Sequence, residues 1–293
     1  MYSVAGLIWG ASFLFIELAL SFLTPIGVAF WRTAFGALAM LVAMMIFRSK
    51  LPTTFDAWKK LTIAGILMSS VPFVLFAYAQ TQVTSALAAI INAVTPITTV
   101  IVILIAFRTE KLKAHVITGI VVGLVGVLIV LGAWQGFGSN NPIAILALLV
   151  AITLYGIGTP YVRKNITPLK LPTEVSVFGQ IGAAAITLLP FYLLSGPLFT
   201  STPNFESIAS IVTLGALGSG VAYLLYYKIL EVVGSAIASS VTYITPVIAV
   251  ILGVLLLGEE LHWYEPVGGL IVILGAAISQ GSILSLFRKK AIA

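Results

Sequence analysis

The chain has 293 residues, of which 60% are hydrophobic and 8% are charged, with a net charge of +6 and a mean hydropathy of +1.15. A soluble domain carries roughly 25% charged residues, so this composition excludes a compact water-soluble protein and predicts an integral membrane protein. The chain has no cysteine, which excludes disulfides, thiol nucleophiles and cysteine-bound metals.

Apolar runs long enough to cross a bilayer follow one another along the chain. A helix needs about 20 mostly apolar residues to cross a hydrocarbon core of ~30 Å. Ten such runs are expected near residues 3–22, 26–47, 60–80, 84–107, 115–133, 142–162, 172–195, 206–230, 236–257 and 264–285. We interpret the first as a membrane helix and not as a signal peptide, because it lacks a basic start and a cleavage site. The predicted fold class is an all-α integral membrane protein with ten transmembrane helices.

The basic residues predict how these spans are oriented. Of the 15 lysines and arginines, all but Arg32 fall at one face of the ten-span arrangement, and the loops of the other face, including 134–141 and 258–266, have none. Positive charge accumulates on the cytoplasmic side of a membrane protein. Both termini are therefore expected in the cytoplasm, with residues 286–293 as a basic tail. The positive charge reflects topology and does not indicate a nucleic-acid partner.

The two halves of the chain resemble each other. The stretch AVTPITTVI at 93–101 returns as YITPVIAVI at 243–251, which is 150 positions later (243 minus 93). Each half, 1–133 and 142–285, contains five predicted spans. Because five is odd, the second half is expected to enter the membrane upside down, as in the inverted repeats of many secondary transporters. A symmetric channel is the alternative.

Two longer stretches carry a resemblance to a known family. They are TSALAAIINAVTPITTVIVILIAFRTEKL (84–112) and GSAIASSVTYITPVIAVILGVLLLGEELHW (234–263). Small residues, then Thr-Pro, an aliphatic run and Gly-Glu resemble the repeat of the drug/metabolite transporter superfamily, specifically of ten-span exporters built from two EamA-type repeats. The first copy departs from this pattern, because Arg108-Thr109-Glu110 stands where the second has Gly-Glu-Glu.

The resemblance implies an activity and a location. It implies a non-enzymatic secondary transporter of the bacterial inner membrane that exports small molecules by alternating access. Within the superfamily the chain looks most like amino-acid exporters, which implies export of aromatic and other amino acids and of related small metabolites. Export of other drugs or metabolites, and passive conduction through a channel, are the alternative functions.

Pro96 and Pro246 fall near the middle of the fourth and ninth spans. Proline lacks an amide donor, so each frees the carbonyl group four residues earlier, on Asn92 and Thr242. Hydrocarbon cannot satisfy a free carbonyl group. We interpret the two prolines as matching hinges beside a polar cavity, with a static packing kink as the alternative.

Several aromatic residues and one amide are expected to line a substrate cavity. Most of them lie at midplane depth, and Tyr78 lies nearer the outer end of its span. The predicted lining residues are Trp9, Phe13, Tyr78, Asn92, Tyr155, Tyr223 and Tyr243. Aromatic side chains also pack in cores or gather at the membrane interface, which is the alternative for each of them. A cavity of this kind, with almost no charge, would suit small amphipathic solutes.

Glu17 and Arg32 are the charged residues expected inside the first two spans, both toward the outer end. Isolated charges in a membrane are costly, so the two are predicted to form an ion pair. One alternative makes Glu17 a protonatable site that couples transport to protons and that Arg32 only holds charged. The other leaves the two groups unpaired and facing a water-filled cavity.

Other chemistry is not indicated by the sequence. The two histidines, His115 and His262, are expected near opposite faces, so no histidine metal site and no metal cofactor are predicted. Gly156-Ile157-Gly158 is not a dinucleotide motif, because no strand precedes it. A phosphate-binding loop for ATP is also lacking. An intramembrane enzyme would need clustered acids or histidines within the spans.

Overall fold

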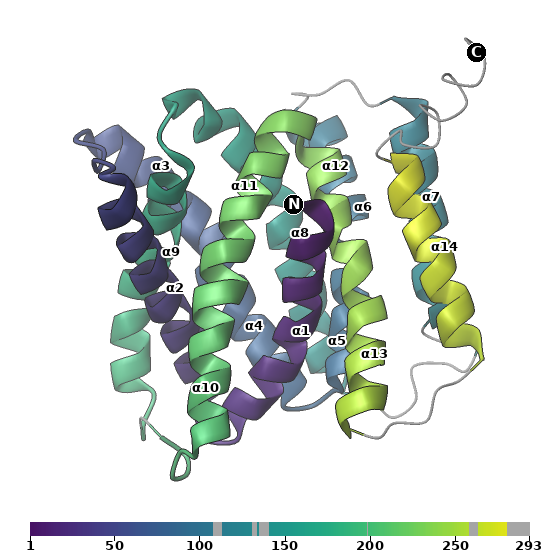
Figure 1. The fold of residues 1–293 in the computed structure, drawn as a ribbon, viewed down its shortest axis with the longest axis horizontal. Coiled ribbons are helices and arrows are strands. Elements are labelled where there is room, and N and C mark those ends of the chain that lie inside the picture. The colour runs from purple at the N-terminus through teal and green to yellow at the C-terminus, as the bar shows by residue number, and fades with distance from the viewer. Residues whose placement is uncertain (108–112, 131–133, 135–140, 198, 258–262, 280–293) are drawn as a thin grey trace.

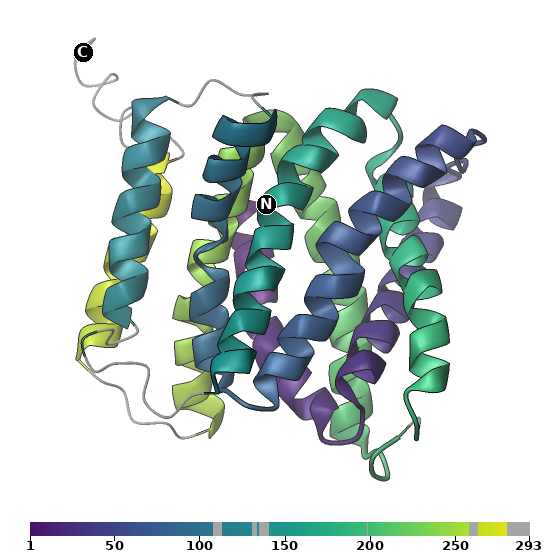
Figure 2. The same cartoon turned by 180° about the vertical axis from the view of Figure 1, so that it is seen from behind.

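The computed structural model describes residues 1–107, 113–130, 134, 141–197, 199–257 and 263–279. Throughout these ranges the secondary structure is helical, with no strand. The helices run side by side, up and down, in one bundle (Figures 1 and 2). This agrees with the predicted all-α class.

The helices are as follows in chain order. The first half contains α1 (Tyr2–Leu20), α2 (Pro25–Phe47), α3 (Phe55–Gly65), η1 (Ile66–Ser70), α4 (Val71–Gln80), α5 (Ser85–Asn92), α6 (Thr95–Val102), η2 (Ile103–Phe107) and α7 (Ala114–Val130). The second half contains α8 (Pro142–Asn165), η4 (Thr167–Leu169), α9 (Thr173–Leu194), α10 (Phe205–Thr213), η5 (Leu214–Val221), α11 (Ala222–Val233), α12 (Ser235–Ser239), η6 (Ser240–Tyr243), α13 (Ile244–Leu257) and α14 (Tyr264–Ser279).

Eight helical segments of the described chain are long and apolar enough to cross a membrane. They are Tyr2–Leu20, Pro25–Phe47, Phe55–Gln80, Ser85–Phe107, Pro142–Leu169, Thr173–Leu194, Phe205–Val233 and Ser235–Leu252. Each coincides with one of the ten predicted spans. The fifth and tenth predicted spans correspond to shorter apolar helices, Ala114–Ile129 and Pro266–Ser279. Ten crossings, and the inverted relation of the halves, remain predictions.

Polar residues just before the apolar runs explain where several helices begin. The side chains of Thr24, Thr54 and Thr84 accept hydrogen bonds from backbone amides three residues later, at the starts of α2, α3 and α5. Such caps satisfy amide groups that have no partner inside the helix. Pro25 follows the first cap, at a position where its missing amide costs nothing. The local sequence therefore determines the turns between spans.

Two helices stand at one edge of the bundle. In both views α7 and α14 lie side by side there (Figures 1 and 2). Their backbones approach closely because glycines face each other. A Cβ at Gly275 would lie 2.4 Å from the amide nitrogen of Gly123, and a Cβ at Gly119 would lie 2.3 Å from that of Ser279. Small residues at such a contact are typical of helix pairs in membranes.

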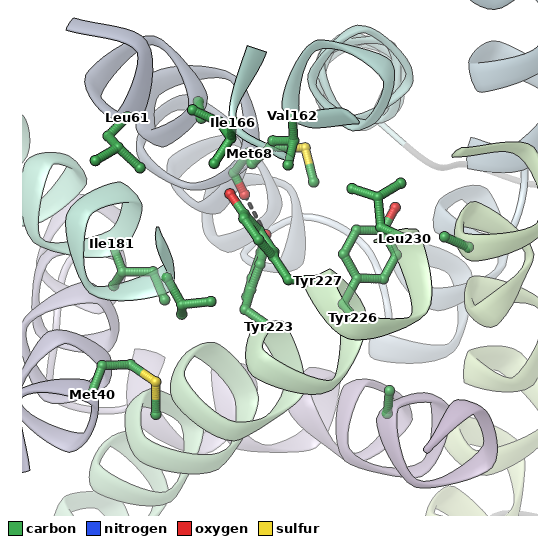
Figure 3. Packing of buried hydrophobic residues seen from close by; sticks show 14 of the residues in the cluster. Met40, Leu61, Met68, Val162, Ile166, Ile181, Tyr223, Tyr226, Tyr227 and Leu230 are labelled. Atoms are coloured by element: carbon green, nitrogen blue, oxygen red, sulfur yellow. Dashed lines mark hydrogen bonds between the residues drawn. The ribbon is translucent and has the colours of Figure 1, made fainter. Parts of the chain in front are cut away.

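The main hydrophobic core lies between α11 and the segments α3, η1, α8 and α9. Figure 3 shows Tyr223, Tyr226 and Tyr227 of α11 projecting toward Met68, with Leu61 and other aliphatic side chains around them. The three tyrosines are buried. This core forms one wall of the cavity described next.

Candidate functional site

A cavity lies inside the bundle, bordered by α1, α2, η1, α4, α8, α11 and the segments around Asn92 and Thr242. Its empty volume, including its opening, is about 560 Å³. Its lining residues are Trp9, Ser12, Phe13, Ile16, Arg32, Met68, Phe73, Phe76, Asn92, Thr95, Tyr155, Thr159, Tyr223, Tyr226 and Thr242.

Five of the seven residues expected from the sequence line this cavity. They are Trp9, Phe13, Asn92, Tyr155 and Tyr223. The other two, Tyr78 and Tyr243, are not among the lining residues, and their role in substrate binding stays a prediction. Tyr243 is fully buried, and its hydroxyl donates to the carbonyl oxygen of Ile120 on α7 at 2.8 Å. Tyr243 is the last residue of the 3-10 turn η6, and its neighbour Thr242 lines the cavity instead.

Aromatic rings form much of the cavity wall. The ring centroid of Trp9 lies 5.0 Å from that of Tyr226 and 5.5 Å from that of Tyr223. Phe76 stacks on Tyr155 and meets Phe13 edge-on, both at 5.9 Å. Such contacts fix the rings in place and leave an apolar surface that a flat or branched apolar group can contact.

Two spans contain π-helical turns beside the cavity, at corresponding places in the two halves. η1 and η5 each widen the helix, and widened turns of this kind are frequent at functional sites. Carbonyl groups of these turns receive hydrogen bonds from aromatic side chains of the cavity. Tyr223 Oη donates to the carbonyl oxygen of Met68 at 2.5 Å, and Trp9 Nε1 donates to that of Gly218 at 3.0 Å. The two acceptors are 150 positions apart (218 minus 68).

The helices that carry the two prolines are interrupted just before them. α5 ends at Asn92 and α6 begins at Thr95, while in the second half α12 and η6 precede α13. The carbonyl groups that proline frees are satisfied by the preceding threonines. Thr95 Oγ1 donates to the oxygen of Asn92 at 2.6 Å, and Thr245 Oγ1 donates to that of Thr242 at 2.7 Å. In each half the proline frees a carbonyl group and the threonine before it donates to that group. This hydrogen bond therefore explains why threonine and proline recur together.

Arg32 is the charged residue of the cavity lining. Its side chain is 6% exposed, and Nε donates to Ser219 Oγ of η5 at 2.9 Å. The guanidinium carbon lies 3.8 Å from the ring centroid of Phe73, a cation–π contact. The sequence placed Arg32 well toward the outside and therefore predicted a cavity with almost no charge. That expectation needs correcting, because the residue is a member of the lining.

Glu17 and Arg32 do not form the ion pair that the sequence predicted. Within the described chain the only ion pair joins Lys60 and Asp56. Glu17 is exposed, and its Oε2 accepts a hydrogen bond from Ser85 Oγ at 2.5 Å. The physical reason is direction, because the glutamate faces the start of α5 while the arginine reaches toward η5.

Four lining residues that were not predicted from the sequence lie one helical turn after a residue that was. Ser12, Ile16, Thr159 and Tyr226 follow Trp9, Phe13, Tyr155 and Tyr223 by three or four positions. Residues at this spacing share a helix face. Extending each identified face by one turn would therefore have found them. Phe73 and Phe76 share a face with each other, yet no identified residue pointed to it.

The structure offers no clustered metal ligands in its described part. Within those residues no group of three or more histidine, aspartate or glutamate side chains could hold a metal ion. The polar side-chain groups of the cavity lining are hydroxyls, the indole N–H of Trp9, one amide and one guanidinium. Such groups can bind a solute through hydrogen bonds and charge, and they form no arrangement of a nucleophile with a base.

Comparisons with known proteins agree with this architecture. The model of the EamA-like transporter family matches residues 1–132 and 142–280. The chain belongs to the EamA-like transporter family. It is thus a multi-pass membrane protein of a transporter family.

The chain is also similar to individual proteins over most of its length. It is 26% identical over 281 residues to the uncharacterized inner membrane transporter YedA of Escherichia coli, covering 95% of this chain and 89% of that one. It is 25% identical over 285 residues to an uncharacterized transporter of Archaeoglobus fulgidus, covering 95% and 96%. Protein PecM of Dickeya dadantii is 23% identical over 247 residues, covering 84% and 82%. A crystal structure with 20% identity has the same fold, with a TM-score of 0.76 over 94% of this chain and 93% of that one.

Proposed function

We propose that this protein exports amino acids, aromatic and others, and related small metabolites across the bacterial inner membrane by alternating access. Membership of the family supports transport, and the inner-membrane name of the relative in Escherichia coli supports the location. The amino-acid class rests on the cavity and on the resemblance of the Thr-Pro repeats to those of amino-acid exporters.

The single observation that carries the proposal is the composition of the cavity. Aromatic rings offer an apolar surface, while Asn92, Thr95 and Thr242 provide polar groups beside the two helix interruptions. An amino acid combines an apolar side chain with a small polar head, so it matches both parts of this lining.

The proposed mechanism uses both halves of the chain. We take the ten predicted spans as two inverted five-helix units, with both termini in the cytoplasm. The matching interruptions before Pro96 and Pro246 are proposed as the hinges at which each unit bends. The matching hydrogen bonds at Asn92 and Thr242 support this symmetry, because they lie 150 positions apart (242 minus 92) in the two halves. Bending at both hinges in turn would open the cavity to one side and then to the other.

Counterflow in liposomes tests the proposal. Purified protein is reconstituted with unlabelled solute inside, and uptake of the labelled solute is followed for a panel of amino acids, sugars and cationic drugs. We expect saturable counterflow of amino acids, with the highest rates for aromatic and branched side chains. Counterflow of cationic drugs alone would favour the alternative exporter function. Flux that does not saturate with concentration would favour a channel.

A further inference from the structure

Arg32 is a buried cation without a negatively charged partner. Within the described chain no carboxylate lies within 4.0 Å of its guanidinium, and Ser219 is the only hydrogen-bond partner of the side chain. A guanidinium has five N–H donors in a planar fork. Its remaining donors and its positive charge therefore have no protein acceptor there. Charged residues inside membrane spans are costly and mark substrate paths more often than packing sites.

The corresponding place in the other half of the chain holds a neutral side chain. Gln180 of α9 takes the place that corresponds to Arg32 of α2. Its Nε2 donates to Ser69 Oγ of η1 at 3.0 Å, as Arg32 donates to Ser219 of η5. Ser69 and Ser219 are repeat partners, 150 positions apart (219 minus 69).

Two glycines support this correspondence. A Cβ at Gly65 would lie 2.5 Å from the backbone oxygen of Gln180, and a Cβ at Gly215 would lie 2.9 Å from that of Arg32. Gly65 and Gly215 are again 150 positions apart (215 minus 65). A neutral amide thus donates to Ser69, the repeat partner of Ser219, beside a matching close contact at a glycine. The positive charge is specific to the half whose side chain lines the cavity.

The cavity offers no counterpart for a positively charged solute group. None of its described lining residues is an aspartate or glutamate. The acidic side chains that the structure describes lie in the first or last turns of helices, at Glu17, Asp56, Glu174, Glu206 and Glu231. An ammonium group in the cavity would find only hydroxyl and amide oxygens and the faces of aromatic rings.

We infer that Arg32 is the specificity-determining residue of this cavity, and that it selects solutes carrying a carboxylate whether or not they also carry an amino group. A carboxylate accepts two parallel hydrogen bonds from a guanidinium, and such charge-assisted bonds are roughly twice as strong as neutral ones. Phe73 covers one face of the guanidinium and keeps it in position. The inference rests on the proposed function in taking this cavity as the substrate site.

Three probes that share one phenyl group separate the two charges. At neutral pH 3-phenylpropionate carries only a carboxylate, phenethylamine carries only an ammonium group, and phenylalanine carries both. Binding of each is measured by calorimetry on purified wild-type protein and on Arg32→Gln, Arg32→Lys and Arg163→Gln variants. The Gln variant reproduces the pairing of Gln180 with Ser69, so it is expected to fold. Arg163 lies outside the cavity and donates to the backbone oxygens of Leu230 and Glu231, which makes its variant the matched control for loss of a positive charge.

We expect wild-type protein to bind both carboxylate probes at least about tenfold more tightly than phenethylamine. Arg32→Gln should weaken binding of both carboxylates about tenfold to a hundredfold, the usual effect of losing a charge-assisted hydrogen bond. Arg32→Lys should retain the preference for carboxylates, because it keeps the charge, and Arg163→Gln should leave all three affinities unchanged.

Three results would overturn the inference. They are equal binding of the carboxylate probes to wild type and Arg32→Gln, phenethylamine binding as tightly as 3-phenylpropionate, and no binding of either carboxylate probe to wild type. Should Arg32→Gln fail to fold, the comparison of the three probes on wild-type protein still decides. Failure of the proposed function looks different: 3-phenylpropionate would bind in an Arg32-dependent way while amino acids show no counterflow.

Discussion

The hydroxyls of Thr95 and Thr245 should stabilise the protein by satisfying the carbonyl groups that the following prolines leave free. Both side chains are buried, at 3% and 0% exposure, and each donates to the carbonyl oxygen three residues earlier. Valine has nearly the same shape as threonine and lacks the hydroxyl. At nearly constant packing, Thr95→Val therefore removes the hydroxyl donor of the Asn92 carbonyl group. Thr245→Val removes the hydroxyl donor of the Thr242 carbonyl group, which keeps a contact with the backbone amide of Ile244. Such a loss costs about 1–3 kcal/mol per site.

The free energy of unfolding in mixed micelles, measured by titration with a denaturing detergent, checks this value. Thr153→Val is the matched control, because its hydroxyl donates to the carbonyl oxygen of Leu149 on the exposed side of the uninterrupted helix α8. We expect the control to lose less than about 0.5 kcal/mol. Thr95→Ser keeps a hydroxyl and should retain part of the stability that valine loses. If the valine variants at 95 and 245 lose no more than the control, the account of the Thr-Pro pair is wrong.

Two further predictions concern the hinges and the close helix contacts. Pro96→Ala and Pro246→Ala restore an amide donor and should slow counterflow while leaving membrane insertion near normal; rates equal to the parental rate would make the interruptions static packing features. Gly65→Ala should lower the free energy of unfolding by about 1–3 kcal/mol, because its Cβ would meet a backbone oxygen at 2.5 Å. The control is Gly182→Ala, because a Cβ there would meet nothing closer than 4.0 Å, and it should change the free energy of unfolding little. Equal losses of stability in both variants would contradict the close contact at Gly65.

Features that depend on local sequence could be predicted well. Eight described spans coincide with predicted ones because hydropathy over about 20 residues is a property of the segment alone. The positions of Pro96 and Pro246 likewise located the interruptions, since proline removes an amide donor wherever it stands. The hydrogen bonds of the preceding threonines needed the structure, because a threonine hydroxyl has several backbone acceptors within reach.

Features that depend on how helices rotate and pack could not be predicted in the same way. The π-turns η1 and η5 and the 3-10 turn η6 change which residues face inward, so Tyr243 turns to α7 while Thr242 faces the cavity. Arg32 was assigned to the outer end from its depth along α2. The depth of a residue does not predict its contacts with distant parts of the chain. The contacts of Arg32 with Phe73 and Ser219 place its charge at the cavity.

The central claim is that solutes cross the membrane through this cavity, and a single introduced cysteine tests it most directly. The chain has no cysteine of its own, so Asn92→Cys places one thiol in the cavity lining and Ser21→Cys places one at the exposed end of α1. Both variants are treated with a charged, water-soluble methanethiosulfonate, with and without excess phenylalanine. We predict that modification at position 92 abolishes counterflow and that phenylalanine slows this modification. Modification at position 21 should leave counterflow unchanged, and phenylalanine should not change its rate. A thiol at position 92 that does not react, or whose modification leaves counterflow intact and is not slowed by phenylalanine, would contradict the claim.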